Sequence, residues 1–140
     1  QVTAERASVS GAEGGCQAEV GTASAMAAAA LTYIKGGTGA ECAHAFAIAL
    51  GNLLGLVCDP VAGLVEVPCV KRNVIGAVNA ISAANMALAG ITSRIPADEV
   101  IDAMGAVGDM MPTDLRETGI GGLAGTPTGI RIAESLRTEW

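Results

Sequence analysis

The segment 74–91 restricts the possible fold more than any other part of the chain. Its apolar content comes from small residues that recur at helical spacing, namely Gly76, Ala77, Ala80, Ala83, Ala84 and Ala87. The whole sequence shares this bias, since hydrophobic residues make up 51% of it but aromatic residues only 2%. A helix that is apolar on most sides is usually buried. We therefore predict an all-α fold, a compact bundle of about five helices, with helix 74–89 the most buried.

Glycine and proline residues delimit the other predicted helices. We predict helices over 17–35, 38–56, 73–89 and 96–111, and a last amphipathic turn or two over 130–136. Thr38 precedes the second of these, and Glu41 follows it at the spacing of a capping box. Pro96 begins the fourth, since proline favours a first helical turn. Residues 126–129 are interpreted as a turn, and no convincing strand is expected because β-branched alternation is absent.

Charge and hydropathy exclude some functions. The net charge is −6 and only 16% of residues are charged, so the chain has no basic stripe for a nucleic-acid backbone. The mean hydropathy of +0.48 raises the question of a membrane span. Segment 74–91 contains Asn79, Ser82 and Asn85, however, and a span needs about 20 mostly apolar residues. We expect one domain, residues 1–140, that is part of a longer cytoplasmic protein.

Four cysteines are the main candidates for chemistry. Cys58 and Cys69 bracket a loop whose two prolines exclude a helix interior, and this loop joins two predicted buried helices. Cys16 follows a glycine pair, whereas Cys42 lies in the middle of a predicted helix. Their spacing matches neither a zinc ribbon nor a ferredoxin. Cys16, Cys58 and Cys69 are therefore candidate metal ligands and Cys42 a core residue, although free cysteines are often simply core residues.

Residues 13–21, 52–69, 71–73 and 115–129 closely resemble the iron–sulfur-dependent L-serine dehydratases, in the C-terminal part of their α chain or α domain. The resemblance covers nearly all of the chain. It implies a helical domain that holds a [4Fe–4S] cluster through Cys16, Cys58 and Cys69. One iron would stay open as a Lewis acid for the serine hydroxyl, and the products would be pyruvate and ammonia. It also implies a cytoplasmic enzyme of amino-acid catabolism and gluconeogenesis.

The resemblance implies further residues and partners. Lys71, Arg72 and Asn73 would bind the serine carboxylate or hydrogen-bond the cluster sulfurs, unless they are only a helix cap and surface charges. The family's proposed base is a histidine outside this region, so the 140 residues alone are expected to be inactive, with His44 a packing residue. The expected partners are L-serine and a β domain or β chain, in a homo- or hetero-oligomer. Glu13, Gln17 and Glu19 are candidates for hydrogen bonding around the ligands.

Three other interpretations remain open. A pyridoxal-phosphate deaminase would catalyse the same reaction, but the chain offers only Lys35 and Lys71 and no phosphate cradle. A related cysteine desulfidase is closer in substrate. A non-catalytic helical interaction domain with core cysteines would contain neither iron nor sulfide, so metal analysis and a visible spectrum distinguish these cases.

Overall fold

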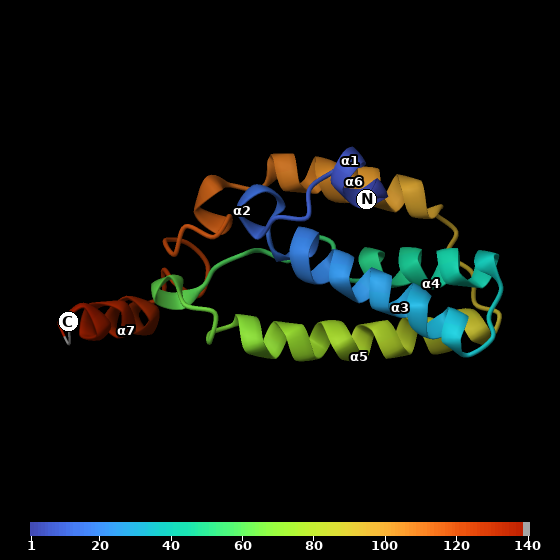
Figure 1. The fold of residues 1–140 in the computed structure, drawn as a ribbon. Coiled ribbons are helices and arrows are strands. Elements are labelled where there is room, and N and C mark those ends of the chain that lie inside the picture. The colour runs from blue at the N-terminus through green and yellow to red at the C-terminus, as the bar shows by residue number, and fades with distance from the viewer. Residues whose placement is uncertain (139–140) are drawn as a thin grey trace.

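The computed structural model of the protein describes residues 1–138, and this part of the chain is helical without a β-strand (Figure 1). The all-α prediction is confirmed. The elements in chain order are α1 (Val2–Arg6), α2 (Gly11–Gly14), π-helix η1 (Gln17–Gly21), α3 (Thr22–Ile34), α4 (Gly39–Gly51), 3₁₀-helix η2 (Val61–Gly63), α5 (Cys69–Leu88), α6 (Ala97–Met110), 3₁₀-helix η3 (Thr113–Leu115) and α7 (Pro127–Thr138). The short helices α1 and α2 were not among the predicted ones.

Helices α3, α4 and α5 pack against one another, and α6 lies against α4 on the side of α1 and α2 (Figure 1). Their contact surfaces are made of alanine, and Ala25, Ala28, Ala45, Ala49 and Ala83 are completely buried. Alanine loses no side-chain entropy in a helix and keeps the helix surface thin. The bundle therefore gains its core from close helix approach rather than from large side chains.

The prediction that helix 74–89 is the most buried is wrong. One face of α5 is buried through Gly76, Ala80, Ala83, Ala84 and Ala87. The opposite face exposes β-branched residues, with Val74, Ile75 and Val78 each more than half exposed. The central helix is α3, which packs against both α4 and α5. The small residues marked one contact face of α5, and no described element covers its other face.

Local signals located most helix ends. Thr38 and Glu41 form the expected capping box, in which the Thr38 side chain accepts from the Glu41 N–H and Glu41 accepts from the Thr38 N–H. The interpretation of 126–129 as a turn is wrong, because Pro127 is the first residue of α7. The Thr126 hydroxyl accepts a hydrogen bond from the Gly129 N–H, which is the cap that this helix start needs.

Helix α5 begins at Cys69 rather than near residue 73. The loop before it contains η2, which packs against α7, and α7 extends from that end of the bundle (Figure 1). No helix in the described part of the chain combines the length and apolar character that crossing a membrane requires.

Candidate metal centre

Three cysteine side chains line one cavity of about 200 Å³. Cys16 and Cys58 are 3% and 4% exposed, and Cys69 is half-buried. The polar side chains that share the lining are Glu19, Asn73 and Glu117. The fold thus brings together three cysteines that lie far apart in the sequence, and they are the three that the sequence selected. Their role as ligands stays a prediction.

Cys16 is positioned by a close approach of backbone segments. The preceding Gly15 has φ +75°, and a Cβ there would overlap the Met111 side chain and the Leu56 carbonyl. The N–H of Gln17 donates to the same Leu56 carbonyl at 2.9 Å. The π-helix η1 starts directly after Cys16, and single π-turns are frequent at functional sites.

Cys58 is held between two residues that are distant in the sequence. Its N–H donates to the Leu115 carbonyl at 2.8 Å, and its carbonyl accepts from the Glu117 N–H at 2.7 Å. Glu117 has φ +65°. A non-glycine residue in this left-handed region costs about 1–2 kcal/mol, and such strain concentrates at functional sites. The bridge therefore fixes both the Cys58 backbone and the Glu117 carboxylate at the cavity.

Cys69 is the first residue of α5. The free N–H groups and the dipole at a helix N-terminus stabilise negative charge, which offsets part of the cost of ionising a thiol there. Asn73, one turn later, donates to the Cys69 carbonyl at 2.9 Å and lines the cavity. This placement puts the Cys69 thiol at the edge of the cavity.

The thiols are costly to ionise in this arrangement. Burial, followed by the hydrogen bond and charge of Cys16, raises the pKa of Cys58 far above its ordinary value. Burial and the neighbouring Cys16 also raise the pKa of Cys69. All four cysteines are free thiols. Three neighbouring thiolates require cations to compensate their charge.

The donor set fits a cluster better than a single ion. Among the described residues, no three His, Cys, Asp or Glu side chains are grouped closely enough to hold one metal ion. A mononuclear site needs its ligand atoms about 2 Å from a common centre. Iron–sulfur clusters bind each thiolate at a separate iron, so they require a cavity rather than a point. Soft, buried thiols around a cavity meet that requirement.

The basic residues after Cys69 differ in their surroundings. Lys71 is exposed. Arg72 is half-buried and donates from one guanidinium nitrogen to the Asp59 carboxylate and to the Val57 carbonyl. Burial lowers the pKa of Arg72, but Asp59 and then Cys16 more than offset this effect and raise it. A role for Lys71, Arg72 or Asn73 in substrate binding stays a prediction.

The remaining candidates do not line the cavity. Cys42 and His44 are on α4, half-buried, and neither lines the cavity. Gln17 is fully buried, and its side chain joins Gly14, Met104 and Gly55 by hydrogen bonds. The Glu13 carboxylate accepts a hydrogen bond from the Ser8 hydroxyl.

Sequence reasoning missed two residues at the site. Asp59, which is 2% exposed, looks like a turn residue before Pro60, and its burial depends on contacts with distant segments. Glu117 reaches the cavity through its bridge to Cys58, which no local pattern reveals. The one signal in the sequence that could have revealed Asp59 was its charge. Asp59 follows Cys58, and the opposite charge of Arg72 lies one helical turn after Cys69.

Fold and site together define an all-helical domain in which three cysteines line one cavity. The sequence matches the family described as serine dehydratase alpha chain over residues 1–124. The probable L-serine dehydratase alpha chain of Bacillus subtilis is 68% identical over 135 residues, which are 96% of this chain and 45% of that protein. The chain belongs to the serine dehydratase α-chain family.

Other relatives agree. The probable L-serine dehydratase alpha chain of Latilactobacillus sakei is 66% identical over 131 residues, covering 94% of this chain and 63% of the relative. The L-serine dehydratase alpha chain of Peptoniphilus asaccharolyticus is 55% identical over 139 residues, covering 99% of this chain and 48% of the relative. The chain spans about half the length of these relatives.

Proposed function

We propose that this chain supplies the cluster-binding part of an L-serine dehydratase. The observation that carries the proposal is the convergence of Cys16, Cys58 and Cys69 on one cavity in a member of this family. The names of the relatives favour serine over cysteine as the substrate. The word "alpha" in those names supports a β chain as the partner.

The three cysteines would hold a [4Fe–4S] cluster. When bound, such a cluster supplies an iron with Lewis acidity for the serine hydroxyl, which is a poor leaving group without it. The chain keeps Cys16 and Cys58 buried, which limits the access of water to the sulfur atoms. Cys69 adds a donor at a helix N-terminus.

The charges around the cavity indicate which end of an amino acid this chain would bind. Its lining includes the carboxylates of Glu19 and Glu117 and the amide of Asn73, and among the described lining residues there is no cation. Carboxylates suit the ammonium group of serine. Groups outside this cavity lining would then bind the serine carboxylate and remove the α-proton. In particular, His44 does not line the cavity.

Anaerobic reconstitution with iron and sulfide tests the proposal. The intact enzyme should show a broad visible absorption and about four irons per site, and should convert L-serine to pyruvate. Cys16→Ala, Cys58→Ala and Cys69→Ala should each lose the cluster and the activity. Cys42→Ala is the matched control, because it should keep both and lose only about 1 kcal/mol of stability through packing. A Cys58→Ala enzyme with full activity would refute the assignment.

The 140 residues by themselves should not release pyruvate, because among the described residues no histidine or lysine lines their cavity, and the two carboxylates that do are proposed to bind the ammonium group. Adding the complementary part of the enzyme should restore pyruvate formation if the two parts dock. Robust deamination by the isolated chain would contradict this expectation, and His44 would then be the first residue to replace.

A further inference from the structure

Asp59 occupies an unusual position for a carboxylate. It is 2% exposed, and it accepts hydrogen bonds from the Arg72 guanidinium and, at 2.7 Å, from the Leu123 N–H. A buried ion pair costs desolvation energy that its attraction offsets only with good geometry and further hydrogen bonds. Asp59 and Arg72 have these bonds, so the pair has a defined geometry and is more than a surface contact.

The pair connects the two cysteines of the central loop. Asp59 directly follows Cys58, and Arg72 lies on α5 one turn after Cys69. Arg72 also donates to the Val57 carbonyl at 2.8 Å. The residues on both sides of Cys58 are therefore attached to the helical turn that carries Cys69. No other ion pair among the described residues involves the loop between these cysteines.

The same pair also reaches a third segment of the chain. Through the Leu123 N–H, Asp59 binds the glycine-rich segment 119–125, and a Cβ at Gly122 would overlap its carboxylate. One buried carboxylate and one guanidinium thus join the loop that carries Cys58, the helical turn that carries Cys69 and the segment 119–125. Lys71, next in sequence to Arg72, is exposed and is not part of this arrangement.

We propose that Asp59 and Arg72 are positioning residues that set the spacing of the Cys58 and Cys69 thiols. This inference rests on the proposed function, because a cluster is the group whose ligands would be spaced. Arg72 is thereby engaged within the protein and is not the group that binds the serine carboxylate. Groups that orient metal ligands commonly change metal affinity by about 10–100-fold when they are replaced.

The first measurement concerns thiol spacing and needs no metal. The intact enzyme, reduced and free of iron, is treated with a short bifunctional thiol reagent, and the Cys58–Cys69 crosslink is quantified by peptide mass spectrometry. The variants are Asp59→Asn, which removes the charge, and Arg72→Lys, which keeps the charge. Lys71→Gln is the matched control on the same helical turn. Circular dichroism records whether each variant keeps its helices.

We expect Asp59→Asn to lower the crosslink yield strongly and Arg72→Lys to lower it less, because the lysine keeps the charge, with Lys71→Gln equal to the wild type. If Asp59→Asn does not fold, Arg72→Lys decides, because a reduced yield supports the proposal and a wild-type yield overturns it. If the pair only stabilises the fold, its replacement should lower the unfolding temperature but leave the crosslink yield unchanged well below that temperature.

The second measurement is cluster retention after reconstitution. The iron and sulfide content of Asp59→Asn should be at least about 10-fold lower than that of the wild type. Arg72→Lys should alter the electron paramagnetic resonance spectrum of the reduced cluster. Wild-type crosslinking, iron content and spectrum in both variants would overturn the proposal. A wild-type enzyme that binds no iron would refute the proposed function instead, while the crosslinking result would still test the pair.

Discussion

The side-chain oxygen of Gln17 accepts a hydrogen bond from the backbone N–H of Gly55 at 3.0 Å, inside the bundle. The same amide donates to the carbonyls of Gly14 and Met104 at 2.9 and 3.0 Å. Gln17 is fully buried and directly follows Cys16, so this one side chain joins three segments beneath a candidate ligand.

Replacing Gln17 with leucine should destabilise the protein strongly. The substitution keeps the approximate volume but removes the hydrogen bonds of the amide with the Gly14 carbonyl, the Met104 carbonyl and the Gly55 N–H. Each lost hydrogen bond costs about 0.5–1.5 kcal/mol, so we expect a loss of about 2 kcal/mol or more in the free energy of unfolding, measured by urea denaturation. Gln1→Leu is the matched control, because Gln1 is exposed and should change stability by less than about 0.5 kcal/mol. Equal effects would show that the buried amide is not structural.

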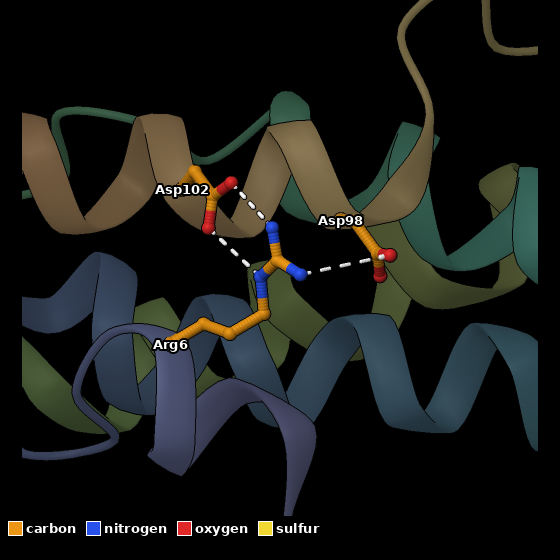
Figure 2. Close-up of polar contacts among 3 residues, drawn as sticks. All are labelled: Arg6, Asp98 and Asp102. Atoms are coloured by element: carbon orange, nitrogen blue, oxygen red, sulfur yellow. Dashed lines mark hydrogen bonds and ion pairs between the residues drawn. The ribbon is translucent and has the colours of Figure 1, made fainter.

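The contact of Arg6 with Asp102 predicts a pH dependence of stability. Figure 2 shows the guanidinium donating to both oxygens of Asp102, with Asp98 more distant at 3.7 Å. The hydrogen bond from Arg6 lowers the pKa of Asp102 below its ordinary value. A carboxyl group with a lowered folded-state pKa stabilises the protein above its unfolded pKa, and this contribution is lost as the pH falls through the folded pKa.

Asp102→Asn should therefore lower the unfolding temperature at about pH 6, and its difference from the wild type should shrink as the pH falls toward about 2. The difference should begin to shrink near the unfolded aspartate pKa of about 3.9. Glu99→Gln is a control on the same helix, because Glu99 forms no ion pair with any residue that the structure describes. A constant difference between wild type and Asp102→Asn across this pH range would contradict the prediction.

Gly122→Ala should destabilise the protein more than Gly90→Ala. Both glycines have positive φ, so either substitution incurs strain of about 1–2 kcal/mol. The Gly90 site is open, whereas a Cβ at Gly122 would overlap Asp59 and should add about 1–3 kcal/mol. Chemical denaturation of both variants measures the difference. Equal losses would show that the 119–125 segment moves away from Asp59 without cost.

Glu117→Gly should stabilise the fold while it impairs the enzyme. Glycine relieves the strain at φ +65°, although its greater freedom in the unfolded chain reduces the gain to at most about 1 kcal/mol. Ala62→Gly is the matched control, since Ala62 has φ +57° and does not line the cysteine cavity. Both variants should unfold at a higher temperature, but only Glu117→Gly should raise the KM for L-serine. An unchanged KM would exclude Glu117 from substrate binding.

Local signals were the reliable part of the sequence. Thr38 and Glu41 located a helix start because a capping box involves only neighbouring residues. Pro96 and the acidic residues after it did the same for α6. The same reasoning failed at Thr126 and Pro127, because the glycine-rich surroundings suggested a turn where a capped helix begins.

The sequence by itself determined the helical class, most helix ends and which three of the four cysteines to consider, because these depend on composition and on residues near one another in the chain. Tertiary structure alone decided that Asp59 is buried against Arg72, that Glu117 lies beside Cys58, and that one face of α5 stays exposed. These features arise when segments more than ten residues apart pack together. Whether such contacts form depends on the desolvation and hydrogen bonding of both segments, and no local sequence pattern contains that information.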